Sequence, residues 1–369
     1  MLLALIAAVA VSQAVPPSPP IPEFSADVRV IRLDVSVVDK KGRPLGGLAA
    51  TDFTVQEDGK PVDVSYFEAV DGRPGVVAGV LDPVVVPPPR RILLLVDTGR
   101  MGLGDLLRAR KQTAAYLRQA GGDGDWVRLV NLSTGRVWDG QLPNDRERLE
   151  QAALGLERRG NFWADFDGAD GGWLDRPIQD RIELDPGPGI SSTGETSGQF
   201  LSQFAQSSGL LGMLEAVMVQ LAAVEGRKAL VLISPGFPYL YGLDRQLQQV
   251  ATLARQAATA VYFLDSVGLE AVVPEPGKPL PSLFGEAWRR SGGAQDLAHA
   301  TGGFTYRFSN SILPGLERVA AEMQTYYVVG YVPTRPEDGR FRSVKVKVGI
   351  RGAQVRTKKG YLAGPRPRR

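Results

Sequence analysis

The segment RRILLLVDTGRMG, residues 90–102, decides the fold of this chain. Its run 92–96 is uninterrupted and aliphatic, which predicts a strand buried on both faces, as in a parallel sheet covered by helices. Asp97 follows this strand directly. Its carboxylate is therefore expected at the edge where the carboxyl ends of the strands meet, the usual ligand edge of an α/β sheet.

Strands and helices alternate from residue 90 to residue 323. This alternation predicts an α/β fold of Rossmann-like type, with a central, mostly parallel sheet and helices on both faces. The expected strands are 92–97, 126–132, 136–138, 229–234, 260–264 and 304–308. The expected helices are 103–119, 145–156, 210–224, 244–258, 286–300 and 312–323. Residues 160–199 break the pattern and are interpreted as an irregular insertion, either a contact patch or a loosely packed lid.

Both ends of the chain have β character. Residues 24–80 predict strands at 28–37, 53–56 and 62–67, with a hairpin turn at 40–42 and a second turn at Asp58 and Gly59. Residues 324–363 predict three more strands, at 326–332, 342–350 and 354–358. We expect these two regions to close one small β-sandwich, with 90–323 inserted between its halves. The Pro-rich residues 83–89 are the expected linker.

Composition excludes several classes of protein. The chain has 369 residues, a formal net charge of +3 and no cysteine. Its length allows one large core and a smaller one. The small net charge does not indicate nucleic-acid binding, and the lack of cysteine rules out disulfides and thiolate metal sites.

The first residues suggest export. Residues 1–14 contain an apolar run and a small-residue pattern that predict a signal peptide cut after Ala14. The alternative is that the run stays as an apolar anchor. Residues 15–22 form a Pro-rich spacer, and 364–369 a basic tail. No later segment has the roughly 18 apolar residues that a membrane span needs, so we expect a periplasmic, secreted or cell-surface protein.

The chain resembles the von Willebrand factor A-related domain proteins of acidobacterial type. The resemblance is carried by six segments in this order: DVSVVDKKGRPLGGLAATDFTVQEDGKP, RRILLLVDTGRM, DWVRLVNLSTGRVWDGQLPND, GRKALVLISPGFP, DLAHATGGFTYRF and TYYVVGYVPTRPEDGRFRSVKVKV. It implies a signal peptide, an A-type domain and flanking β-structure. The biochemical role of such proteins is largely undefined.

The resemblance also implies a metal-ion-dependent adhesion site, which this sequence has in degenerate form. The family's first loop reads DxSxS, but Gly99 and Met101 stand here in place of its serines. Pro235 stands where the third loop has an aspartate, with Ser234 as a possible hydroxyl ligand. Hard cations require oxygen ligands, so we expect neither a metal nor another cofactor. The second-loop threonine of the family would be Thr193 or Thr196.

Asp97 has three other interpretations. Its carboxylate could accept N–H bonds from its own turn or cap the following helix. It could also hold Mg²⁺ or Mn²⁺ as a metal-dependent adhesion site. Use of Asp97 and Asp265 as a hydrolytic acid/base pair is the third alternative, although the two residues should lie two strands, roughly 9 to 10 Å, apart.

The sequence carries no recognised catalytic set. GxSxG and GxxxxGK[ST] motifs are absent, and the single histidine, His299, is expected on a helix surface. Lys345 and Lys347 alternate with valines and should form a solvated strand face. We therefore expect an exported, non-enzymatic binding or scaffold protein for an unknown protein or cell-surface ligand. The expected partner-binding residues are Asp97, Thr98, Gly99, Ser234, Gly236 and Asp265.

Overall fold

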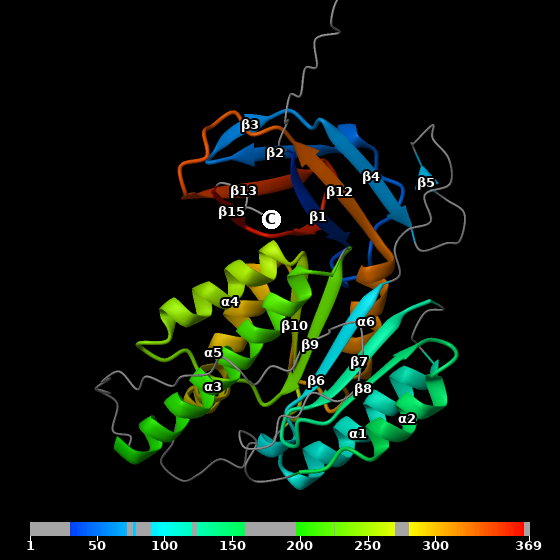
Figure 1. Ribbon diagram of the computed structural model, residues 1–369, viewed down its shortest axis with the longest axis vertical. Helices are drawn as coiled ribbons and strands as arrows, with labels where there is room; N and C mark the ends of the chain where they lie inside the picture. The colour runs from blue at the N-terminus through cyan, green and yellow to red at the C-terminus, as the bar shows by residue number, and fades with distance from the viewer. Residues whose placement is uncertain are drawn as a thin grey trace, which may run out of the picture.

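The computed structural model describes residues 30–71, 77–78, 90–119, 124–158, 197–224, 226–269 and 280–364. These residues form six α-helices and three sheets. A β unit lies against one end of an α/β unit (Figure 1). The predicted mixed α/β class, with parallel strands, is confirmed. The expected signal peptide, spacer and linker, residues 160–196 of the expected insertion, and residues 365–369 of the tail lie outside the described residues.

The α/β unit is built on a six-stranded sheet in the order β11-β10-β9-β6-β7-β8. Its parallel strands are β6 (Arg91–Val96), β7 (Trp126–Asn131), β9 (Lys228–Ser234), β10 (Thr259–Asp265) and β11 (Thr305–Tyr306). The edge strand β8 (Val137–Gln141) runs antiparallel to β7. The sheet is therefore mixed, and parallel everywhere except at this edge.

Helices cover both faces of this sheet (Figure 1). One face carries α1 (Leu103–Gln119), α2 (Arg146–Leu154) and α6 (Leu313–Gln324). The other carries α3 (Ser197–Ala222), α4 (Asp244–Gln256) and α5 (Leu280–Thr301). Successive residues of β6 serve the two layers in turn, since Leu94 belongs to the first core and Leu93 and Leu95 to the second. This explains why the strand is apolar throughout.

The β unit combines strands from the two ends of the chain. One sheet has the order β14-β1-β12-β4-β5, and the other β15-β13-β2-β3. The first contains β1 (Ile31–Val38), β4 (Tyr66–Asp71), β5 (Val77–Ala78), β12 (Thr325–Tyr331) and β14 (Gln354–Arg356). The second contains β2 (Phe53–Glu57), β3 (Lys60–Val62), β13 (Arg340–Val348) and β15 (Gly360–Ala363). Both sheets bury side chains in one core around Phe53, Tyr327 and Val346.

Several expected boundaries are wrong. Residues 62–67 are not one strand: Val62 ends β3 in one sheet, and Tyr66 begins β4 in the other. The turn at 40–42 closes only a single bridge, Val38 to Pro44, before the chain crosses to the second sheet. β15 was not predicted. α3 begins at Ser197 and α5 at Leu280, earlier than expected, so residues 197–199 are helical rather than irregular.

The two units meet at the amino ends of β9 and β10. Arg227, which precedes β9, donates from Nη2 to Ser36 Oγ of β1 at 2.8 Å, and its guanidinium lies 4.5 Å from the ring centre of Tyr326. On α6, Glu322 forms an ion pair with Arg356 of β14. No helix in the described part of the chain is long and apolar enough to cross a membrane.

Candidate functional site

Asp97 lies at the carboxyl end of β6 and is almost completely buried. Its backbone N–H donates to the Ile233 carbonyl at 2.9 Å, which extends the ladder with β9 by one step. Its side chain makes no capping hydrogen bond to the short 3₁₀ turn that follows, Thr98–Arg100. Instead, Oδ2 accepts a hydrogen bond of 2.7 Å from the hydroxyl of Ser234. The alternative that Asp97 accepts N–H bonds from its own turn is therefore wrong, because its carboxylate is bound by the hydroxyl of the neighbouring strand instead.

Arg100 provides the positive charge at this carboxylate. Its Nε lies 3.7 Å from Asp97 Oδ2, and its Nη2 donates to the carbonyl of Gly236. The guanidinium therefore links the loop after β6 to the loop after β9. Burial raises the pKa of Asp97, while Arg100 and Ser234 act in the opposite direction. Gly236 is required here, since it has φ +87° and a Cβ would lie 2.4 Å from that of Ser291.

Thr98 belongs to a separate buried polar cluster. Its Oγ1 lies 2.7 Å from Asn131 Oδ1, 2.6 Å from Ser133 Oγ and 2.8 Å from the Glu157 carbonyl. Asn131 Nδ2 also donates to that carbonyl, at 2.8 Å. The cluster ties the loops after β6 and β7 to the chain at residue 157. Sequence reasoning missed Asn131 and Ser133, although the polar NLS directly after an apolar strand was a usable signal.

Asp265 has a different set of partners. It ends β10, which is separated from β6 by β9, so the expected two-strand spacing from Asp97 is confirmed. Its carboxylate accepts from the Val267 N–H at 3.0 Å and from Arg307 Nε at 3.4 Å. Burial raises the pKa of Asp265, against the effect of these donors. The structure does not bring the carboxylates of Asp97 and Asp265 into one hydrogen-bonded set.

Most of the expected partner-binding residues are inaccessible. Asp97, Thr98, Ser234, Gly236 and Asp265 are buried, and Gly99 is half-buried. These six residues lie largely below the surface at this edge of the sheet, and we call them the floor. A partner would have to contact other residues. The expected function therefore needs a surface that the sequence did not indicate.

Large apolar side chains are exposed on the segments that follow β6, β9, β10 and β11, and we call them the apolar rim. Its members are Leu103 (70% exposed), Leu107 (45%), Tyr239 (53%), Tyr241 (79%), Leu269 (60%) and Phe308 (55%). The sequence did not reveal the rim, because an apolar loop residue gives no sign of whether it points inward or outward.

Phe308 is held outward at some conformational cost. It has φ +57°, a region that residues other than glycine rarely adopt. The guanidinium of Arg307 lies 4.7 Å from the centre of its ring. Because Arg307 also binds Asp265, a buried carboxylate indirectly supports the exposed aromatic ring.

The described residues contain no group of three or more His, Cys, Asp or Glu side chains placed to hold a metal ion. Within the floor, the Asp97 carboxylate and the Ser234 hydroxyl are paired, and Arg100 lies beside them. Thr193 and Thr196 lie outside the described residues. His299 is exposed on α5, as expected.

No protein-family model matches the chain, and no curated protein matches it significantly.

Proposed function

We propose that the protein is an exported, non-enzymatic binding protein whose α/β unit is of von Willebrand factor A type. Its partner is a protein that docks on the apolar rim. The observation that carries this proposal is the rim itself: six exposed apolar side chains gather on four segments at one edge of the sheet.

The chemistry of the rim suits a protein interface. Aromatic and arginine side chains are enriched where proteins bind one another, and large exposed apolar patches commonly mark such sites. The rim combines Tyr239, Tyr241 and Phe308 with Arg307 beneath one ring. Beneath the rim, the hydrogen bonds of Asp97, Ser234 and Arg100 join neighbouring loops. These bonds hold the loops that carry the rim in fixed positions.

The proposal includes independence from metal ions. Arg100 already places a positive charge beside Asp97 and donates to the carbonyl of Gly236. A divalent cation would have to displace this guanidinium and would gain one carboxylate and one hydroxyl. Mg²⁺ gives up its waters reluctantly for so few ligands. Metal-dependent adhesion through Asp97 is the second candidate, favoured only by the Asp97–Ser234 pair.

The test is partner capture with matched variants. The rim variant is Tyr241→Ser with Phe308→Ser. The control is Val332→Ser with Ile350→Ser, which removes exposed apolar groups from the β unit (42% and 37% exposed). Each protein is immobilised and exposed to the exported protein fraction of its source cells.

A partner retained by the native protein and by the control, but lost with the rim variant at unchanged melting temperature, supports the proposal. Equal capture by all three proteins, or no capture above an empty matrix, contradicts it. A partner that binds only with Mg²⁺ or Mn²⁺ present, and is lost with Asp97→Ala, favours the second candidate.

A further inference from the structure

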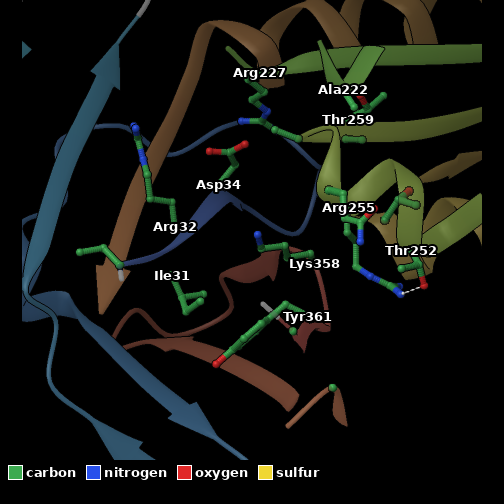
Figure 2. Close-up of a pocket in the computed structure, with 18 residues that line it drawn as sticks. Ile31, Arg32, Asp34, Ala222, Arg227, Thr252, Arg255, Thr259, Lys358 and Tyr361 are labelled. Carbon is green, nitrogen blue, oxygen red and sulfur yellow. Dashed lines mark hydrogen bonds between the residues drawn. The ribbon is translucent and has the colours of Figure 1, made fainter. Parts of the chain in front are cut away.

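A cavity of about 820 Å³ lies between the two units, at the opposite end of the sheet from the rim. Its walls come from β1, from the amino ends of β9 and β10, from the carboxyl ends of α3, α4 and α5, and from the segment before β15 (Figure 2). A volume of this size is in the range of small-molecule sites, roughly 300 to 1,000 Å³.

The cavity has an excess of positive charge. Its charged lining residues are Arg32, Asp34, Arg227, Arg255 and Lys358. Arg32 lies at the margin, with a largely exposed side chain 4.0 Å from Glu68. Of the other three cations, Arg227 and Lys358 interact with Asp34, whose charge acts against burial to raise the pKa of both. Arg255 turns along the wall instead, where its Nη2 donates to Thr252 Oγ1 at 2.8 Å. In Figure 2, Arg227 and Lys358 approach Asp34 from two sides.

Arg227 has hydrogen-bonding capacity to spare. It is only 9% exposed, and Nη2 donates to Ser36. Its Nε and Nη1 meet no acceptor at full hydrogen-bonding geometry among the described residues, although Tyr262, Asp34 and Glu322 lie near enough to raise its pKa against the effect of burial. Buried donors without an acceptor are costly. An anion in the cavity would supply the missing acceptors.

Lys358 is the second cation with hydrogen-bond donors that are not used among the residues described. Its side chain reaches into the cavity from the β unit. Burial lowers its pKa, since the charged ammonium is held in a poorly solvated place. No hydrogen bond from its ammonium is found within the described part of the chain. A bound anion would favour the charged form and provide that contact.

Arg227 and Lys358 do not serve to neutralise the carboxyl ends of helices. Three helices end at the cavity, and carbonyls at helix carboxyl ends attract positive charge. Lys228 already donates to the carbonyls of Val224 and Gly226 after α3, and Arg255 Nη1 lies 3.5 Å from the Ala300 carbonyl of α5. No helix carbonyl in the described residues accepts a hydrogen bond from Arg227 or Lys358.

We infer that this cavity binds a small organic anion with at least two negative charges, carried by phosphate or carboxylate groups. Arg227 and Lys358 hold the charged groups, and Arg255 adds a further positive charge to the wall. The site lies far along the sheet from the rim and does not depend on the proposed function.

The test is calorimetric titration of the full chain with ATP and with citrate as probes. Lys358→Met should weaken binding by about tenfold, as expected for loss of a charged hydrogen bond. Lys345→Met is the matched control, because Lys345 is exposed on β13 outside the cavity. Binding of ATP alone indicates a phosphate ligand, and binding of citrate alone a carboxylate ligand.

A second variant distinguishes a direct effect on binding from loss of folding. Asp34→Asn removes the negative charge inside the cavity and should tighten binding by several-fold, since repulsion of the anion is relieved. A gain in affinity does not result from loss of structure. The inference is overturned if neither probe binds up to about 10 mM, if Lys345→Met weakens binding as much as Lys358→Met, or if Asp34→Asn weakens it.

Discussion

The hydroxyl of Ser234 donates a hydrogen bond of 2.7 Å to Oδ2 of Asp97, and so joins the carboxyl ends of the adjacent strands β9 and β6. The same hydroxyl accepts from the Gly236 N–H at 3.0 Å. Ser234 is fully buried and Asp97 nearly so. The floor of the sheet edge is thus organised around one carboxylate that water hardly reaches.

Ser234→Ala should destabilise the protein by about 1 to 3 kcal/mol, because a buried carboxylate loses a donor and the Gly236 N–H loses its acceptor. Urea unfolding measures the change. In a double-mutant cycle, Asp97→Ala and Ser234→Ala should be non-additive. Additive effects would show that the hydrogen bond contributes nothing of its own.

The native protein should melt at the same temperature with EDTA and with excess Mg²⁺, because Arg100 already compensates Asp97. Arg100→Ala removes that compensation but adds no oxygen ligand, so Mg²⁺ should leave the melting temperature of this variant unchanged as well. Differential scanning fluorimetry with both additives checks both statements. A Mg²⁺-dependent rise in the native protein that disappears in Asp97→Ala contradicts the first.

Thr98→Val should cost about 1 to 3 kcal/mol of unfolding free energy, since a methyl group then replaces the hydroxyl among the buried polar groups of Asn131 and Glu157. Thr54→Val is the control, because Thr54 is exposed on β2. The control should change stability by less than about 0.5 kcal/mol. Chemical denaturation of both variants distinguishes them, and equal losses would refute the role given to Thr98.

The sequence predicted the part of the fold that depends on local pattern. An aliphatic run predicts that β6 is buried on both faces. The alternation of Lys345 and Lys347 with valines predicts a strand with one solvated face. Both predictions agree with the structure. The chain crossing between Val62 and Tyr66 was missed, because both flanking strands are apolar and only the sandwich determines which sheet each joins. α3 was started too late, because the polar run of residues 206–209 separates Phe200, Leu201 and Phe204 from the apolar stripe that begins at Leu210.

The sequence predicted where three of the expected site residues lie along the sheet, but not the side chains that they contact. Asp97, Ser234 and Asp265 do lie at one edge of the sheet, as strand order requires. Their partners come from other segments: Arg100 reaches Gly236, and Arg307 reaches Asp265. Which arginine turns toward which carboxylate depends on loop conformation, and neither composition nor periodicity contains that information.

Gly302→Ala should disturb the contact between the two units. Gly302 follows α5 with φ +88°, and a Cβ there would lie 3.0 Å from the carbonyl carbon of Thr357 and 3.2 Å from the Lys358 nitrogen. Left-handed strain alone costs about 1 kcal/mol or more, and the clash with backbone adds to it. Gly349→Ala, which meets nothing within 4 Å, is the control. Thermal unfolding should show a clear drop for the first variant only, and equal melting temperatures would contradict this prediction.

Glu322 should make the stability of the protein depend on pH. It is completely buried on α6 between Arg318 and Arg356. Burial raises its pKa from 4.5 to about 7, and Arg227 and Arg318 offset only part of this effect. The folded protein therefore holds the proton more tightly than the unfolded chain does. The resulting stabilisation is complete below the unfolded pKa and is lost as pH rises through about 7.

The native protein should accordingly lose on the order of 2 to 3 kcal/mol of unfolding free energy between pH 5 and pH 8 through this one group. Glu322→Gln replaces the carboxyl with a neutral group of the same shape, so its stability should fall less over the same interval. Glu317→Gln, on the exposed side of the same helix, should follow the native curve. Urea unfolding of the three proteins at several pH values gives the comparison. Parallel curves for the native protein and Glu322→Gln would mean that Glu322 stays ionised throughout, held by its arginines against the cost of burial.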